Sequence, residues 1–256
     1  MSNTLHKFGW IPDLPDHRDL HLALKPLRIT DLPPKVDLSI TPSMPPVYDQ
    51  GNLGSCTANA IGAAFEFEQK KQDNTKDFPP SRLFIYYNER VMEGTPFTDS
   101  GAMIRDGVKS VAKLGVCPET EWPYDISKFT IPPSLNCYID AQKHQALQYM
   151  RVIQTQDQMM SCLADGYPII FGATLYESFE SPSVAKTGIV PMPSSNESVI
   201  GGHAILACGY DTSDNTFLVR NSWGTNWGIN GYCKFPMAYL TNNSLCDDLW
   251  TIRLVE

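Results

Sequence analysis

Apolar and small residues recur at helical spacing through much of the first two thirds of the chain. From Cys56 to about Lys71 the chain is rich in alanine and has no proline, and Ile61, Ala64 and Phe65 follow the period of a helix. Small residues on several faces predict a helix that is packed closely on all sides. The same period predicts further helices over Ser81–Arg90, Ala102–Leu114 and Gln156–Ala164.

The last third changes to short apolar runs rich in β-branched and aromatic residues, which are typical of strands. The predicted strands cover Tyr167–Leu175, His203–Tyr210, Thr216–Arg220, Gly231–Phe235 and Leu249–Leu254. Helices first and strands later indicate an α+β protein with two segregated parts. A cleft between two such parts is a common place for a functional site.

Proline is concentrated at the front of the chain, where eight of the 20 prolines precede Val47. Because proline removes a backbone donor and fixes φ, this stretch is expected to run extended over a surface. Apolar side chains such as Phe8 and Trp10 interrupt it, and we expect them to dock on the main body.

The 256 residues correspond to one large domain or two small lobes. Apolar residues make up 42% of the chain, which excludes a disordered chain.

The formal charge of −8 disfavours a nucleic-acid partner, because duplex-binding proteins carry a basic patch or excess. No apolar run reaches the roughly 18–20 residues that span a bilayer. No secretory signal follows Met1, so a cytoplasmic location is expected, with non-classical or specialised secretion left open.

The seven cysteines are odd in number and form no Cys-x-x-Cys pair, which argues against a disulfide framework or a zinc ribbon. This indicates a reducing compartment with mostly buried, inert thiols. His17 and His21 stand four apart among aspartates. The known metal motif with this spacing requires a specific partner set, so a solvated surface is the better interpretation. We predict no metal and no cofactor.

The segment from Tyr48 to Cys56 is a turn-rich loop that leads directly into the first predicted helix. A cysteine at a helix N-terminus lies near free N–H groups and the positive end of the helix dipole. Both favour the thiolate, which is the state that a nucleophile needs. By itself this pattern is weak, because more cysteines are buried than catalytic.

Two downstream segments strengthen the interpretation. Gly201-Gly-His203 leads into an apolar strand, and its glycines let a peptide backbone approach closely. The stretch Val219–Gly231 holds Asn221, two tryptophans and three glycines, and a structural turn does not readily explain both tryptophans. His203 follows Cys56 by 147 residues, and Asn221 follows His203 by 18.

Together, these segments resemble the papain family of cysteine peptidases, in which His and Asn follow the cysteine by roughly 130–150 residues. His203 lies within this window and Asn221 lies somewhat beyond it. The matching residues are Gln50-Gly51, Gly54-Ser55-Cys56, Gly202-His203-Ala204, Asn221-Ser222-Trp223-Gly224-Thr225, Trp227-Gly228 and Asn230-Gly231-Tyr232. The resemblance implies a papain-like two-lobed fold, with a helical N-terminal lobe, a β-rich C-terminal lobe and the cleft between them. It places this peptidase domain over residues 32–256.

The resemblance also assigns roles to residues. Cys56 is expected to be the nucleophile, and His203 is expected to act as base and then as acid. Asn221 is expected to orient the imidazole, and Gln50 is expected to bind the oxyanion together with the Cys56 backbone N–H. Trp223 is expected to shield the contact between Asn221 and His203 from water. The residues expected to line the substrate are Ser100, Gly101, Gly172, Gly202 and Trp227.

Two positions near the nucleophile depart from the family pattern. Leu53 stands where the family usually has a disulfide-bonded cysteine, and Thr57 stands where it usually has tryptophan. These departures leave the catalytic set intact and resemble the bacterial and viral branches of the family more closely.

Residues 1–31 are too short for the long helical pro-segment of the family. One hypothesis is that this N-terminal extension docks beside the cleft and limits access to it. An extension that only completes the fold is an equal alternative.

The functional prediction is a monomeric peptidase that acts on peptides or proteins and is sensitive to protein or small-molecule thiol-protease inhibitors. One alternative is a catalytically silent or gated binding protein with the same fold, because fold does not prove activity. Another alternative keeps the mechanism and changes the acceptor, as in a thiol acyltransferase or an isopeptidase.

Overall fold

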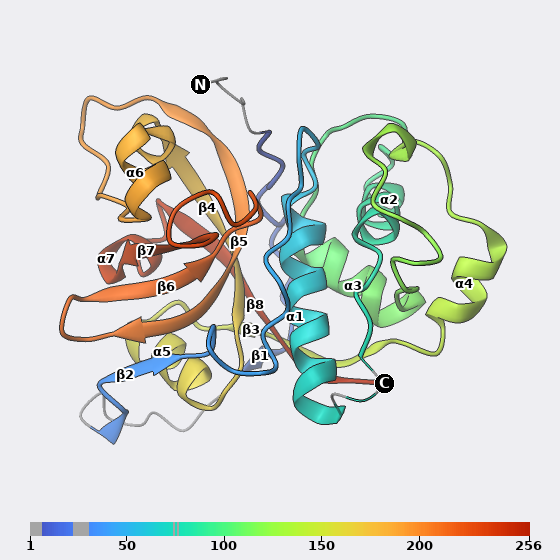
Figure 1. Ribbon diagram of the computed structural model, residues 1–256, viewed down its shortest axis with the longest axis horizontal. Helices are drawn as coiled ribbons and strands as arrows, with labels where there is room; N and C mark the ends of the chain where they lie inside the picture. The colour runs from blue at the N-terminus through green and yellow to red at the C-terminus, as the bar shows by residue number, and fades with distance from the viewer. Residues whose placement is uncertain (1–6, 23–30, 74, 76) are drawn as a thin grey trace.

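The computed structural model describes residues 7–22, 31–73, 75 and 77–256. Figure 1 shows a helical half beside a half built on a sheet. The helical half contains α1 (Cys56–Asp73), α2 (Arg82–Met92), α3 (Ile104–Leu114) and α4 (Leu135–Ala141). The helices come from the N-terminal part and most strands from the C-terminal part, so the predicted α+β class is confirmed.

An eight-stranded sheet is formed by the described residues, in the order β1-β3-β8-β4-β5-β6-β7, with β2 paired to β5. The pairs are antiparallel except that between β1 and β3. The strands are β1 (His21–Leu22), β2 (Lys35–Asp37), β3 (Ala146–Val152), β4 (Ile169–Tyr176), β5 (Val199–Asp211), β6 (Thr216–Arg220), β7 (Tyr232–Pro236) and β8 (Cys246–Val255). Because β5 lies between β4 and β6, its residues are held from both sides.

Shorter helices complete the described chain. Their bounds are η2 (Ile126–Lys128), α5 (Gln156–Ala164), η3 (Glu177–Glu180), α6 (Pro182–Thr187) and α7 (Met237–Leu240). The helix predicted over Gln156–Ala164 matches α5 at both ends.

Two apolar cores support the two halves. One lies in the sheet half and includes Phe171, Phe217 and Phe235. The other joins the helical half to the sheet and includes Phe65 of α1 and Trp250 of β8. The prediction that the first helix is packed on all sides is confirmed, because every residue of α1 from Cys56 to Gln69 is buried.

The ends of the helices follow local chemistry. The Ser81 hydroxyl caps α2 by accepting a hydrogen bond from the Phe84 N–H. The helix α3 ends where Gly115 takes a φ of 76°, a value that favours glycine, and the predicted stop at this glycine is confirmed.

The sequence analysis missed β1, β2, β3, α4, α6 and α7. The helices among them have between four and seven residues, too few to show a helical period. The seven-residue strand β3 has neither clean alternation nor a continuous apolar run, and its inner residues are exposed or only partly buried. The strand β5 also begins four residues before the predicted start at His203, so this histidine lies inside a strand.

Two glycines with nearly equal positive φ values provide a test of the packing between α3 and α4. Gly94 and Gly115 have φ values of 75° and 76°. A Cβ at Gly94 would meet nothing within 4 Å, whereas a Cβ at Gly115 would lie 1.7 Å from the Ala141 carbonyl oxygen. Gly94→Ala is expected to lower the free energy of unfolding by about 1 kcal/mol through φ alone. Gly115→Ala is expected to lower it by roughly 2–4 kcal/mol, because it adds a clash with backbone.

The free energies come from urea unfolding of the two variants and the parent chain. Equal losses in the two variants would show that the helix contact at Gly115 does not constrain the fold.

Candidate active site

Three elements bring together the predicted catalytic side chains. The helix α1 begins at Cys56, β5 carries His203, and the loop after β6 carries Asn221. His203 Nε2 lies 2.8 Å from Asn221 Oδ1, and the Ala204 N–H donates to Cys56 Sγ at 3.4 Å. All three side chains are buried. Cys56 at the start of α1 therefore contacts strand β5, and the His203 imidazole of this strand is held by the Asn221 side chain.

Two tryptophans pack behind the histidine. The Trp223 ring lies 5.1 Å from the His203 ring at an interplanar angle of 32°. The Trp227 ring packs edge-on against Trp223 at 5.3 Å and also contacts Phe179 at 5.5 Å. Trp223 thus covers the imidazole, and Trp227 forms the next layer of the same aromatic wall.

The side chain of Gln50 is fully buried and held from both ends. The Ser222 hydroxyl donates to Gln50 Oε1 at 2.6 Å, which fixes the orientation of the amide. Gln50 Nε2 donates to the Leu53 carbonyl at 2.9 Å and to the Lys7 carbonyl at 3.1 Å. The Tyr124 hydroxyl donates to the Gln50 carbonyl at 3.0 Å.

The sequence analysis did not assign roles to Ser222 and Tyr124. Ser222 stands beside Asn221 in a motif that the sequence analysis recognised, and Tyr124 belongs to a Trp-Pro-Tyr triplet. Their contacts with Gln50 cross 172 and 74 positions of the chain, so local sequence could not show them.

Residues 7–11 form an N-terminal strip, and residues 9–11 of this strip pair with both halves of the protein. The Trp10 N–H donates to the Gly202 carbonyl of β5 at 2.9 Å. On the other side, the Ala102 N–H donates to the Gly9 carbonyl at 2.7 Å, and the Ile11 N–H donates to the Ala102 carbonyl at 3.0 Å. Figure 1 shows this N-terminal strip descending between the helical half and the sheet half.

Three glycines predicted to line the substrate lie against this strip. A Cβ at Gly172 would come within 1.9 Å of the Trp10 ring, and a Cβ at Gly202 within 2.9 Å of it. A Cβ at Gly101 would lie 2.2 Å from the Gly9 carbonyl oxygen. The lack of side chains at these positions therefore makes room for an extended backbone and a large ring.

Of the other two residues predicted to line the substrate, Trp227 lies in the aromatic wall described above, and the Ser100 hydroxyl contacts its own loop. This hydroxyl lies 2.9 Å from the Thr95 hydroxyl and donates to the Gly101 carbonyl at 3.1 Å. Its role toward substrate stays a prediction.

Asp248 anchors the strip from within the sheet half. Its carboxylate accepts from Trp10 Nε1 at 3.1 Å, from the Asp13 N–H at 2.7 Å and from Arg151 at 2.8 Å. Burial, helped by the neighbouring Asp13 carboxyl, raises the pKa of Asp248 to about 7. The sequence analysis missed this anchor.

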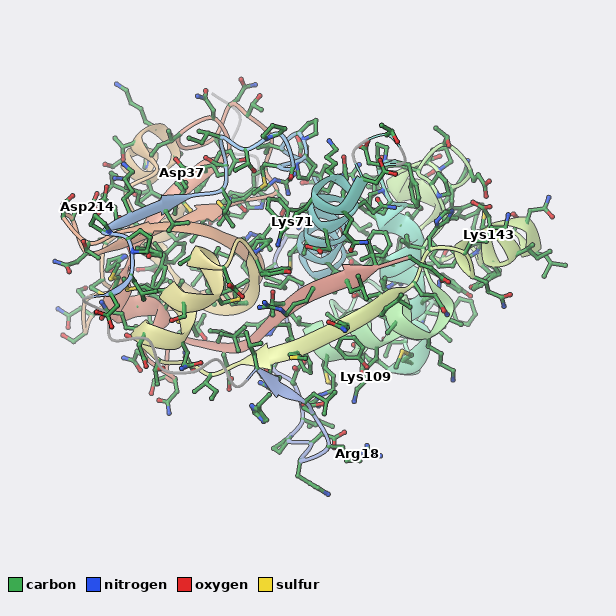
Figure 2. All side chains as sticks on the ribbon, turned by 90° about the horizontal axis from the view of Figure 1, so that it is seen from below. Arg18, Asp37, Lys71, Lys109, Lys143 and Asp214 are labelled. Atoms are coloured by element: carbon green, nitrogen blue, oxygen red, sulfur yellow. The ribbon has the colours of Figure 1, made fainter. Side chains whose placement is uncertain are left out.

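A second anchor holds the loop that follows the strip. Arg105 of α3 pairs with Asp19 at 2.6 Å, and both side chains are buried. Lys109 of the same helix reaches Asp16 at 3.5 Å, and Figure 2 shows Lys109 near the loop that carries Arg18. Removing one partner of a buried pair usually costs several kcal/mol, so this loop is strongly tied to α3.

In this arrangement burial opposes the stabilisation of the Cys56 thiolate that is expected from the start of a helix. Burial raises the pKa of the Cys56 thiol to about 12, although backbone hydrogen bonds from Ala204 and Gly9 oppose the rise. Loss of hydration outweighs the donors because the N-terminal strip lies on the sulfur and excludes water. Burial under the strip therefore favours the neutral thiol over the thiolate.

The departure at Thr57 has a structural explanation. Its hydroxyl donates to Glu89 at 2.6 Å inside the helical half. Burial raises the pKa of Glu89 well above its usual value, which favours the neutral form of this carboxyl. A tryptophan at this position could not supply the hydroxyl that donates to Glu89 Oε1.

One group of side chains in the described part of the chain has the spacing to hold a metal ion, formed by Cys117, Glu121 and Cys137. It includes none of the site residues. Within the same residues, no helix is long and apolar enough to cross a membrane.

Comparison with known proteins defines the class. A model of the papain family of cysteine proteases matches residues 32–247, and the chain belongs to this family. An uncharacterized peptidase C1-like protein of Acanthamoeba polyphaga mimivirus is 42% identical, over 99% of this chain and 89% of that protein. The structure of xylellain, a cysteine protease from Xylella fastidiosa, is 44% identical with a TM-score of 0.90, covering 100% of this chain and 99% of that one.

A cysteine protease of Carica candamarcensis, solved in complex with E-64, shares the fold with a TM-score of 0.60. It is 21% identical and covers 79% of this chain and 88% of that chain. The two relatives above 40% identity come from a virus and a bacterium, which confirms the expected resemblance to those branches.

The raised pKa of Cys56 predicts how its alkylation depends on pH. Because the thiol is neutral well below pH 12, the thiolate fraction should rise about tenfold for each pH unit. The rate of Cys56 carboxamidomethylation by iodoacetamide in the full chain is therefore expected to rise without a plateau from pH 6 to pH 9. Mass spectrometry of the peptide that carries Cys56 measures this rate.

Cys162 is the matched control, because burial also raises its pKa to about 12. A Cys56 rate that stays constant down to pH 5 would contradict the prediction and would indicate a thiolate paired with His203.

Proposed function

We propose that this chain hydrolyses peptide bonds as a cysteine peptidase, with Cys56 as nucleophile and His203 as proton carrier. In this proposal Asn221 orients the imidazole, and Gln50 stabilises the oxyanion. The observation that carries the proposal is the 2.8 Å contact between His203 Nε2 and Asn221 Oδ1, beside a cysteine at the first position of a helix. Family membership and the cysteine proteases among the relatives support it.

The proposed reaction uses each group in turn. His203 takes the proton from Cys56, and the thiolate attacks the carbonyl carbon of the substrate. The negative charge moves to the carbonyl oxygen, where Gln50 Nε2 and the backbone N–H of Cys56 donate to it. His203 then gives its proton to the leaving amine, and a thioester remains on Cys56. Water activated by His203 hydrolyses the thioester and restores the thiol.

We further propose that the described arrangement is a self-blocked state. The Lys7 carbonyl accepts a hydrogen bond from Gln50 Nε2 at 3.1 Å, on the donor that the oxyanion needs. Gly9 donates to the Cys56 sulfur, and Trp10 lies against two glycines that were predicted to line the substrate. A substrate must displace this strip before it can reach the thiol. The proposal favours a gated peptidase over a silent binding protein.

The catalytic assignment predicts the activity of point variants. Hydrolysis of a fluorogenic dipeptidyl amide in dithiothreitol should disappear in Cys56→Ala, because no other group replaces the nucleophile. Gln50→Ala should lower kcat by about 10²–10³, because it removes one oxyanion donor. E-64 should block the activity of the parent chain.

Cys162→Ala is the matched control, because this buried thiol lies on α5 in the sheet half and should leave kcat unchanged. Turnover that survives in Cys56→Ala would refute the assignment. A parent chain that binds E-64 covalently at Cys56 but hydrolyses no peptide would favour an acyltransferase or isopeptidase.

The self-blocked state predicts that weakening the strip raises activity. Trp10→Ala removes a buried ring and its hydrogen bond to Asp248, so the open state should become more populated. The expected gain in kcat/KM is on the order of ten- to a hundredfold. Leu14→Ala is the matched control, because Leu14 lies in the same segment with 67% of its surface exposed.

A chain that lacks residues 1–31 provides the second arm of this test, with circular dichroism to verify its fold. If both variants are soluble and folded and neither changes kcat/KM, the gating proposal is refuted. That result would favour an extension that only completes the fold.

A further inference from the structure

Two buried thiols outside the active site, those of Cys117 and Cys137, lie close together. The sulfur atoms of Cys117 and Cys137 and a carboxylate oxygen of Glu121 all lie within 4.8 Å of one another. Both cysteines are free and have at most 1% of their surface exposed. Cys117 follows the end of α3, and Cys137 lies in the first turns of α4.

The backbone on each side of the pair is held independently of the thiols. The Ser81 N–H donates to the Cys117 carbonyl at 2.8 Å, and the Val116 N–H donates to the His144 carbonyl at 3.0 Å. Ser134 caps α4 by accepting from the Cys137 N–H, and its hydroxyl also lies 3.2 Å from the Cys137 sulfur. These backbone hydrogen bonds therefore hold the two sulfur atoms near each other while α4 is closed.

The composition of the cluster distinguishes a disulfide from a metal site. A structural zinc site needs four ligands, and the described residues bring three to this point. The third, Glu121, is exposed, whereas both thiols are buried. A disulfide needs only the two groups that are buried together.

We propose that Cys117 and Cys137 form a redox pair that closes to a disulfide under oxidising conditions. A low-molecular-weight disulfide such as glutathione disulfide is the oxidant. One protein thiolate attacks it, a mixed disulfide forms and one glutathione leaves as the thiolate. The second protein thiolate then attacks the mixed disulfide and displaces the other glutathione. The protein loses two hydrogen atoms, and glutathione disulfide becomes two molecules of glutathione.

The oxidant reaches the buried pair by opening of α4. This helix has seven residues and lies at the outer edge of the helical half (Figure 1). Figure 2 shows Lys143, two residues beyond α4, at the same edge of the molecule. Short peripheral helices open more readily than a core helix such as α1.

The bond would close the segment from Cys117 to Cys137 into a loop, and this loop supports the active site. Within it, Tyr124 donates to the Gln50 carbonyl and lies 2.5 Å from the Ser55 hydroxyl. Cross-linking the ends of this loop restricts the unfolded chain and stabilises the fold. The oxidised protein should therefore hold the turn before Cys56 more firmly against heat.

The experiment uses the full chain with Cys56→Ala, so that the proposed nucleophile does not react. The reduced protein is incubated with glutathione disulfide in its native state, and separately refolded from denaturant in a glutathione redox buffer. After blocking of free thiols, trypsin cuts at Lys128 and places Cys117 and Cys137 on different peptides. Mass spectrometry then detects a joined peptide about 2 Da lighter than the sum of its parts.

The proposal expects this joined peptide in both arms and a rise of about 5–10 °C in the thermal midpoint of the oxidised protein. Both should vanish in Cys137→Ser and persist in Cys162→Ser, which changes an equally buried thiol on α5. Three results would overturn it: no joined peptide in either arm, equal pairing of Cys117 with other cysteines, or one zinc bound per chain and lost in Cys137→Ser. None of these readouts depends on peptidase activity.

Discussion

The close packing of α1 against β5 is the constraint on which the rest of the site depends. The helix is buried from its first residue to Gln69, and its Asn59 and Ala60 line a small gap together with Ala204 of β5. Small residues on the helix let the two halves approach until the Ala204 N–H reaches the Cys56 sulfur at 3.4 Å. Larger side chains here would move the cysteine away from the strand that carries the imidazole.

The same closeness makes the chemistry of Cys56 depend on what covers it. A sulfur between two packed halves has little water of its own, and the strip at Gly9 and Trp10 removes what remains. Burial at this position disfavours the thiolate, although the start of a helix favours it. In the proposed cycle, release of the strip therefore both admits substrate and restores the hydration that the thiolate needs. The anchor at Asp248 sets how firmly the strip stays in place.

Much of the fold was predictable because long elements carry clear periods. The ends of α5 and the stop of α3 at Gly115 follow from local residue types. The strand β3 and the helix α4 were missed because one has a mixed pattern of burial and the other has seven residues. Such elements are stabilised by neighbours distant in sequence, so local pattern carries little information about them.

The sequence by itself determined the class of the protein and the set of residues that meet at its site. Local motifs show each of these residues. The cysteine precedes a helix of small residues, the histidine lies at a strand, and the asparagine lies among tryptophans. Only the tertiary structure decided three properties: the burial that raises the pKa of Cys56, the Lys7 carbonyl that accepts from the Gln50 amide, and the anchor at Asp248. These properties depend on which distant segments exclude water from a group or donate hydrogen bonds to it, and that is settled only when the chain is packed.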